Sequence, residues 1–306
     1  MTQPPFWQPA EDRKQLWRTI LGLFLVMFIW VLATFAISFA AVSFLPVPPD
    51  EVANGSSQIG AFAMFSTFFG FHIGLAIVLP LLHKRSYFSL FGPDRQLNGK
   101  HFRRGVLATL AVFVLITLIS LLEPAFLPSG MSPPAELNQP LQSWAIGVIP
   151  ALFLVFMQSL AEELVFRGYL LQQLHARFRS PLLWAVLPAL IFGALHFDPF
   201  TFGMMNATAT VLNAALVGTL AAFITVRTGN IGAAVGLHFG NNASVVLLGQ
   251  ADHLSGFSLF TVEMDPTGSY MTYSLIMSSL VMFVAFMLWW RWMARHRPIA
   301  NDAGAA

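Results

Sequence analysis

The sequence predicts an all-α membrane protein, a polytopic helix bundle of about eight transmembrane helices with both termini in the cytoplasm. Of its 306 residues, 56% are hydrophobic and only 10% are charged, whereas a soluble domain carries about 25% charged residues. The chain also contains repeated apolar runs near the ~20 residues that a helix needs to cross a bilayer. Finally, Lys and Arg are confined to every second connection between these runs, as expected for alternate crossings of a membrane.

The apolar runs are separated by connections rich in proline, glycine or charge. They lie at residues 19–44, 59–82, 105–123, 143–163, 182–197, 209–226, 231–249 and 271–290. The fifth run is short, and the fourth is expected to continue past its charged residues toward residue 176. The first run is too long for the core of a signal peptide and lacks a convincing cleavage site, so we expect a retained helix.

The connections differ systematically in charge. Basic residues precede the first run and follow the second, fourth, sixth and eighth: Arg13, Lys14, Arg18, Lys84, Arg85, Arg95, Lys100, Arg103, Arg104, Arg177, Arg179, Arg227, Arg291, Arg295 and Arg297. The other connections contain acidic residues and no Lys or Arg: Asp50, Glu51, Glu123, Glu136, Asp198, Asp252, Glu263 and Asp265. Because cytoplasmic loops are enriched in Lys and Arg, this pattern predicts cytoplasmic termini and a multi-pass protein of the cell (inner) membrane.

The expected partner of these basic segments is the lipid bilayer. The isoelectric point near 9.2 follows from basic residues that flank the spans on one side, where an anionic leaflet attracts them. The high isoelectric point therefore does not indicate nucleic acid. There are no cysteines, which excludes disulfides, a thiol nucleophile and a thiolate metal site.

One arginine, Arg167, does not follow the charge pattern. It belongs to the stretch "LAEELVFRGY" at residues 160–169, together with the adjacent Glu162 and Glu163. Glu163 and Arg167 are four residues apart, so they share a helix face and can pair, leaving Glu162 to exchange protons. Ionisable groups at membrane depth are costly and usually functional. The alternative interpretation is structural, with the Glu163–Arg167 pair locking two helices together.

Two further runs carry polar groups at membrane depth. His196 lies in "LIFGALHFDPF", and His238 lies in "GAAVGLHFGNNAS" with Asn242 one helical turn later. Small residues surround both histidines and allow close helix approach. A single buried histidine is more often a hydrogen-bonded core residue, and His72 in the second run is interpreted in this way. Two histidines, an asparagine and a Glu-Glu-Arg cluster on three runs instead indicate a shared polar pocket.

Three motifs on these runs resemble those of a known family. "EELVFR" fits EExxxR, "FGALH" fits FxxxH and "HFGNN" fits HxxxN. This resembles the CPBP family of intramembrane proteases (CAAX protease and bacteriocin-processing, also called Abi), which includes the type II CAAX prenyl endopeptidase. The resemblance implies an active site formed by Glu162, Glu163, Arg167, His196, His238 and Asn242. It suggests a protease-like core at 141–250, between N-terminal transmembrane helices and loops at 1–140 and a last helix with a cytoplasmic tail at 251–306.

The resemblance implies a hydrolase, an endopeptidase that cleaves membrane-associated peptides or proteins, some of them lipidated. Peptide hydrolysis needs an activated water, stabilisation of the carbonyl oxygen and a proton for the leaving amine. We expect Glu162 and His196 to hold and deprotonate the water, with Glu163 and Arg167 orienting Glu162. His238 and Asn242 are expected to donate hydrogen bonds to the oxyanion, and no cofactor is expected.

Other mechanisms and functions remain open on sequence grounds. Glu162, His196 and His238 could instead bind Zn²⁺ and leave one position for water, although the chain has no HExxH motif and Asn242 is a poor zinc ligand. A transporter could use the same Glu, His and Arg side chains as a proton relay, but no internal repeat is evident. A non-catalytic membrane scaffold of the same fold is the third possibility.

Overall fold

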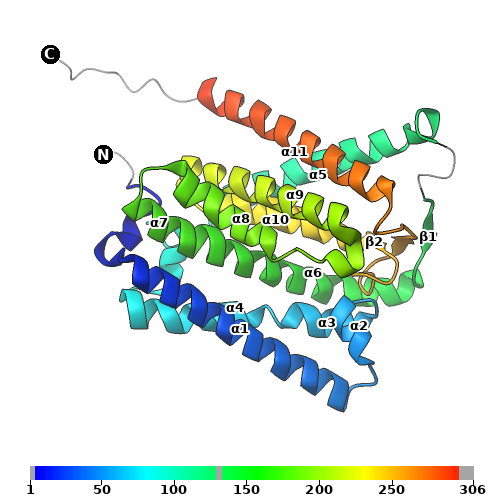
Figure 1. Ribbon diagram of the computed structural model, residues 1–306, viewed down its shortest axis with the longest axis horizontal. Helices are drawn as coiled ribbons and strands as arrows, with labels where there is room; N and C mark the ends of the chain where they lie inside the picture. The colour runs from blue at the N-terminus through cyan, green and yellow to red at the C-terminus, as the bar shows by residue number, and fades with distance from the viewer. Residues whose placement is uncertain (1–3, 129–132, 296–306) are drawn as a thin grey trace.

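The computed structural model describes residues 4–128 and 133–295 and is dominated by helices (Figure 1). The α-helices are α1 (Leu16–Phe44), α2 (Pro49–Asn54), α3 (Gln58–Ser66), α4 (Phe69–Val78), α5 (Gly99–Ser120), α6 (Leu141–Glu163), α7 (Leu171–Arg177), α8 (Leu187–Ala194), α9 (Pro199–Thr228), α10 (Gly232–Ala243) and α11 (Ser269–Arg295). Three π-helical segments are η2 (Leu79–His83), η5 (Leu164–Leu170) and η6 (Leu182–Val186), and short 3-10 turns are η1 (Gln8–Arg13), η3 (Tyr87–Phe91), η4 (Glu123–Ala125) and η7 (Ser244–Val246). The expected cytoplasmic tail after α11, residues 296–306, lies outside the described residues.

Within the described residues, six helices are long and apolar enough to cross a membrane. They are Leu16–Phe44, Gln58–His83, Gly99–Ala125, Leu141–Arg177, Pro199–Thr228 and Ser269–Trp292. A shorter apolar helix, Leu182–Ala194, corresponds to the fifth run. The all-α polytopic membrane bundle is therefore confirmed. The fourth run continues past its glutamates, as predicted, because α6, η5 and α7 follow one another without a break.

The seventh predicted run, 231–249, is shorter than expected. It is helical only over Gly232–Ala243, and the chain then forms η7 and a strand. The Ser258 hydroxyl donates to the carbonyl of Val245 (2.6 Å), and the Leu259 N–H donates to the carbonyl of Val246 (3.1 Å). These carbonyls are the acceptors that a further helical turn would use. In the described part of the chain, six of the eight predicted runs therefore form long spans, and the fifth and seventh form shorter helices.

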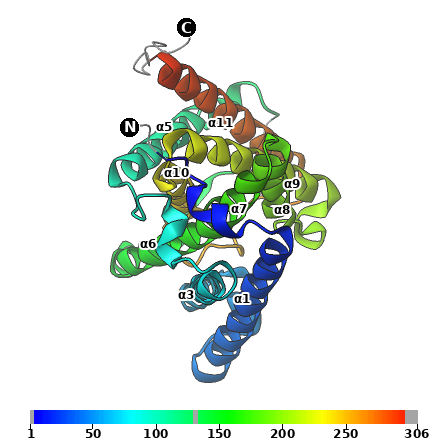
Figure 2. The ribbon, with the colours of Figure 1, turned by 90° about the vertical axis from the view of Figure 1, so that its left-hand side faces the viewer.

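Successive helical segments run alternately between two ends of the bundle (Figure 1). The long helix α6–η5–α7 passes through the middle. The helices α1, α3 and α4 lie on one side of it, and α5, α8, α9, α10 and α11 lie on the other (Figures 1 and 2). The turn η1 and the C-terminal end of α11 lie at the same end. Their common location agrees with the charge pattern of the connections, which predicts both termini on one side of the membrane.

Small residues bring α10 against α5. A side-chain carbon at Gly236 would collide with the Phe102 carbonyl, and one at Gly105 would collide with the Ala233 carbonyl. The Thr109 hydroxyl on α5 also donates to the carbonyl of Leu237 on α10 (3.0 Å). Close approach of this kind is how helices associate where lipid supplies no hydrophobic driving force. It fixes the position of α10, which carries two of the polar side chains singled out above.

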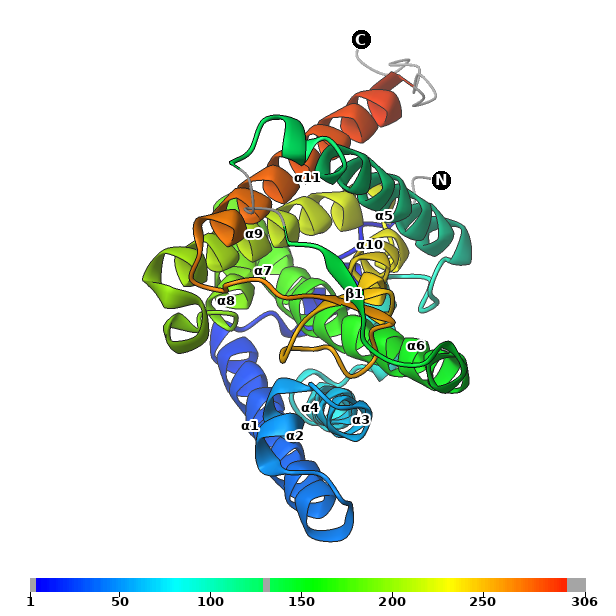
Figure 3. The same ribbon diagram turned by 90° about the vertical axis from the view of Figure 1, so that its right-hand side faces the viewer.

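A small sheet, which the sequence did not predict, covers the opposite end of the bundle from η1 (Figure 3). Its strands are β1 (Ala135–Leu137), β3 (Phe260–Val262) and β2 (Leu248–Gln250), in that order across the sheet. β3 is antiparallel to β1 and parallel to β2. The Asn138 side chain, just after β1, donates to the carbonyls of Ser255 and Ser258 in the loop between β2 and β3, both at 2.9 Å.

We expect both ends of the chain to lie in the cytoplasm, because Lys and Arg occur only in the connections at that end. A reporter enzyme that is active only outside the cytoplasm should be inactive when fused after Ala306. The same reporter should be active when fused after Asn54, in the first connection at the sheet end. Strong activity of the C-terminal fusion would contradict this orientation.

Candidate active site

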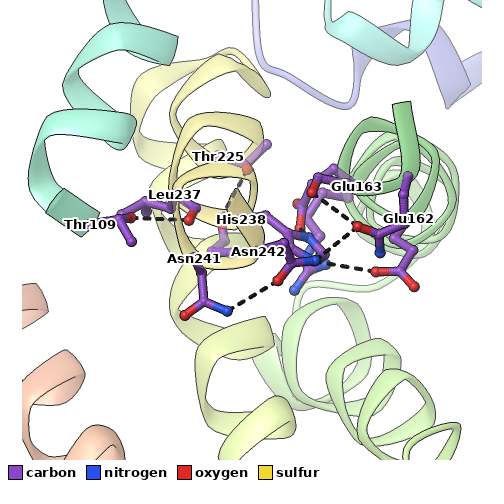
Figure 4. Close-up of polar contacts among 12 residues, drawn as sticks. Thr109, Glu162, Glu163, Thr225, Leu237, His238, Asn241 and Asn242 are labelled. Atoms are coloured by element: carbon purple, nitrogen blue, oxygen red, sulfur yellow. Dashed lines mark hydrogen bonds and ion pairs between the residues drawn. The ribbon is translucent and has the colours of Figure 1, made fainter. Parts of the chain in front are cut away.

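The polar side chains meet where α6 and α10 pack antiparallel to each other (Figure 4). The Asn242 amide donates to Gln158 Oε1 at 2.8 Å. One turn away, His238 Nε2 lies 3.3 Å from Glu162 Oε2. Each helix contributes two residues spaced by four, so both pairs lie on one face of the helix–helix contact. These four side chains thus form two polar contacts between α6 and α10, one helical turn apart.

Glu163 forms a buried ion pair with an arginine. Arg167 Nη1 lies 2.8 Å from Glu163 Oε1, and the two side chains are only 4% and 1% exposed. The guanidinium also lies over the Phe192 ring, 5.1 Å from its centre, and packs against Gly218 of α9. The predicted Glu163–Arg167 pair is thus present, and Arg167 lies in the π-helical segment η5, a local geometry that is frequent at functional sites.

His238 lies between the two glutamates (Figure 4). Its Nδ1 atom is 2.9 Å from Glu163 Oε1, and its Nε2 atom faces Glu162. Because a carboxylate only accepts hydrogen bonds, Nδ1 carries the proton of that contact. Nε2 can then exchange a second proton with Glu162. The contacts therefore run from Arg167 through Glu163 and His238 to Glu162.

One oxygen of Glu162 is left unused within the described part of the chain. Oε2 is buried and has no hydrogen-bond partner there, although it lies at ion-pair distance from His238. Buried polar atoms are nearly always hydrogen-bonded, and an exception calls for an explanation. Glu162, His238 and Asn242 line a cavity of about 830 Å³. The Glu162 carboxylate therefore lies at the wall of a cavity large enough to hold water or another polar group.

His196 lies on another part of the cavity wall, just after α8. Its Nδ1 atom is 2.9 Å from the Phe192 carbonyl, so Nδ1 donates and Nε2 remains available. The Phe192 ring lies 4.8 Å from the His196 ring and 6.0 Å from the His238 ring. The Phe192 ring thus contacts the rings of both histidines. His196 itself is exposed and lines the cavity.

The chain is similar to known proteins over the segment that contains this site. Residues 143–244 match the family model "Type II CAAX prenyl endopeptidase Rce1-like". The matched segment contains all six side chains that the resemblance singled out. The uncharacterized protein YyaK of Bacillus subtilis (strain 168) is 26% identical over 245 residues, which cover 78% of this chain and 79% of the relative. The Rce1-like match supports an intramembrane endopeptidase, and the apolar helices support an integral multi-pass membrane protein.

Part of the site lies outside the Rce1-like segment. α5 and α11 supply cavity-lining residues, among them Arg104, Phe286 and Trp289, and β2 supplies all three of its residues. The motifs gave no signal for these. Gln158 lies inside the segment but was not assigned to the site. Its spacing of four from Glu162 was the signal that could have found it.

The donor atoms do not form a ready metal site. Among the described residues, no three His, Asp or Glu side chains are grouped closely enough to hold a metal ion. The set proposed from sequence, Glu162, His196 and His238, is therefore not found as one such group among these residues. His238 also has both ring nitrogens facing carboxylates.

His72 in the second run belongs to the packing and not to this cluster. Its two ring nitrogens lie 2.6 Å from the Tyr87 hydroxyl and 3.0 Å from the Met157 carbonyl. The interpretation of His72 as a hydrogen-bonded core histidine is confirmed.

Replacing Arg167 by Ala should destabilise the protein as well as inactivate it. The change leaves Glu163 buried without its cation, and breaking one side of a buried pair costs about 3–5 kcal/mol. We expect the melting temperature in detergent to fall by roughly 5–10 °C. Arg103→Ala, which removes an exposed arginine on α5, is the matched control and should leave the melting temperature unchanged. Equal melting temperatures for the two variants would contradict the role given to the Glu163–Arg167 pair.

Proposed function

We propose that the chain is a glutamate-type intramembrane endopeptidase that hydrolyses peptide bonds in membrane-associated peptides or proteins. The observation that carries this proposal is the position of Glu162, whose side chain lines the cavity while its Oε2 atom lies 3.3 Å from His238 Nε2. A carboxylate at the wall of a cavity, beside a histidine, is a suitable base for a water molecule. The Rce1-like match gives the reaction class.

In the proposed reaction, Glu162 removes a proton from a water bound at the cavity wall. The free Nε2 atom of His196 accepts the other hydrogen bond of this water and orients it. The oxygen then attacks the carbonyl carbon of the substrate, and the proton held by Glu162 passes to the leaving nitrogen as the C–N bond breaks. Glu162 thus acts first as the base and then as the acid, because the proton that it takes from water is the one that it gives to the leaving nitrogen.

Two donors are proposed to stabilise the negative charge that develops on the carbonyl oxygen. The Asn242 amide uses one N–H on Gln158 and has a second one to offer, since an amide nitrogen carries two. The Nε2 atom of His238 is the other candidate donor. A preorganised donor of this type contributes about 2.7–4 kcal/mol to lowering the barrier.

The substrate is proposed to be an extended, membrane-associated peptide segment, including lipidated ones. Support comes from the cavity, whose walls on α5, α9 and α11 are mainly apolar and include Met282, Phe286 and Trp289. Such walls can accept hydrophobic side chains or an acyl or prenyl chain beside the polar cluster. We propose the cell membrane as the site of action.

A proton-coupled transporter or a non-catalytic scaffold would use the same polar cluster without hydrolysis. Neither would require Glu162 for cleavage of a peptide. Purified protein and a quenched fluorescent peptide therefore separate the proposed endopeptidase from both alternatives.

We expect Glu162→Gln to lower kcat by about 10²–10⁴-fold, the usual contribution of a general base. The amide keeps the shape of the side chain but cannot accept the proton of water, so folding and peptide binding should persist. The measurement is cleavage of a reporter peptide by protein in detergent or nanodiscs. Glu136→Gln, at an exposed carboxylate on β1, is the control and should retain full activity. Near-normal cleavage by Glu162→Gln would remove it from the role of base.

We also propose that no metal takes part. Cleavage should therefore stay within about twofold of the untreated value after exhaustive incubation with a membrane-permeant chelator, because His196 and His238 are not arranged with Glu162 as one ligand set. Loss of activity that is restored by Zn²⁺ and not by Mg²⁺ would establish the metal mechanism instead.

A further inference from the structure

Gln158 of α6 belongs to the polar cluster but has no role of its own in the reaction proposed above. It lies four residues before Glu162, on the same face of the helix, and it lines the cavity. Its side chain is only 5% exposed. A buried amide of this kind has one carbonyl oxygen and two N–H groups that need partners. The partners of the oxygen therefore decide which way the N–H groups face.

The side-chain oxygen of Gln158 accepts two hydrogen bonds from the protein. The Asn242 amide donates to Oε1 at 2.8 Å, and the Ser159 hydroxyl donates to it at 3.2 Å. The Asn242 amide is itself oriented, because its own oxygen accepts from the Asn241 side chain at 3.1 Å (Figure 4). With its oxygen directed to these two donors, the planar amide of Gln158 directs its N–H groups away from them.

The Gln158 nitrogen lies close enough to the Asn242 amide for both to bind one ligand atom. Nε2 is at most about 2.6 Å from Oε1, the combined length of the C=O and C–N bonds of an amide. It is therefore no more than about 5.4 Å from Asn242 Nδ2. Two N–H donors at the usual distance of ~2.9 Å can share one oxygen up to a separation of about 5.8 Å.

We propose that Gln158 is a further catalytic residue, whose Nε2 atom donates a hydrogen bond to the carbonyl oxygen of the scissile bond beside Asn242. The inference rests on the proposed endopeptidase function and adds a donor to the two assigned above. The carbonyl oxygen becomes negatively charged when water attacks, and a donor that is already oriented in a buried site stabilises this charge without reorganisation. The orientation comes from the two hydrogen bonds to Oε1.

The spacing along α6 suits a shared reaction centre. Four residues of helix rise by about 6 Å, so Gln158 and Glu162 lie on successive turns of one face. A water held by Glu162 and a carbonyl oxygen held by Gln158 are then neighbours along that face. The attacked carbon lies between them, about 3–3.5 Å from the water in a reactive geometry. Base and oxyanion donor are thus positioned by the same helix.

The first test is a double-mutant cycle on kcat. The probe is a quenched ten-residue peptide selected from a random pool for binding to the full-length Glu162→Gln chain in nanodiscs. Gln158→Met keeps the length of the side chain and removes its donors, so kcat should fall roughly 10²-fold. In an Asn242→Ala chain, the same change should lower kcat by a further tenfold or more, at least about as expected for a separate donor.

The cycle separates contact with the substrate from a positioning role. If Gln158 only held Asn242 in place, its replacement would have no effect in the Asn242→Ala chain, and that result would overturn the proposal. Gln142→Met is the matched control, because it makes the same chemical change at an exposed glutamine of α6. It should retain full activity.

A second measurement does not depend on the yield of folded variant. A tetrahedral phosphonate, whose charged oxygens resemble the oxyanion, replaces each peptide bond of the probe in turn. Gln158→Met should raise the Kd of the tightest phosphonate roughly 10- to 100-fold. The Kd of the parent peptide, measured in the Glu162→Gln chain, should rise less than about twofold. Equal changes in both Kd values would show a structural effect and overturn the proposal.

The two proposals can fail separately. Cleavage by the wild-type chain, without a selective loss of phosphonate binding in Gln158→Met, would refute only the role of Gln158. Selective loss of phosphonate binding, with no cleavage by the wild-type chain, would refute the endopeptidase function and leave Gln158 as a donor to anionic groups in the cavity. Failure to select any binding peptide would overturn both.

Discussion

The buried ion pair between Arg167 and Glu163 is the interaction on which the rest of the site depends. An unpaired carboxylate in a low-dielectric interior is strongly destabilising or becomes protonated. With Arg167 beside it, Glu163 stays an acceptor and fixes the ring of His238 through Nδ1. This orientation in turn directs Nε2 toward Glu162. Each contact positions the group that makes the next one, and the series ends at the carboxylate of Glu162.

The antiparallel register of α6 and α10 is the second requirement. Gln158 faces Asn242 and Glu162 faces His238, and a shift by one residue would rotate one helix by about 100° and separate both pairs. The register is held by groups remote from the chemistry. Close glycine contacts fix α10 against α5, and the indole N–H of Trp144 at the start of α6 donates to the carbonyl of Val246 (2.7 Å).

The sequence could predict contacts within one helix but not those between helices. A spacing of four residues was enough to pair Glu163 with Arg167, because helix geometry is local. It could not show that Asn242 would meet Gln158, 84 residues away, or that His238 would lie between two glutamates. The early end of the seventh run depends on pairing with β3. Strands of three residues are too short for their alternation to be recognised in the sequence.

The walls of the cavity and its reactive groups come from different parts of the chain. The six polar side chains all lie within residues 143–244, whereas Met282, Phe286 and Trp289 of α11 lie outside that segment. Replacing one of these apolar side chains changes the width of the cavity without altering the hydrogen bonds that hold His238. The apolar side chains of α11 that shape the cavity and the polar side chains that could react therefore lie on different helices. The range of accepted ligands can thus differ between relatives while the polar cluster stays the same.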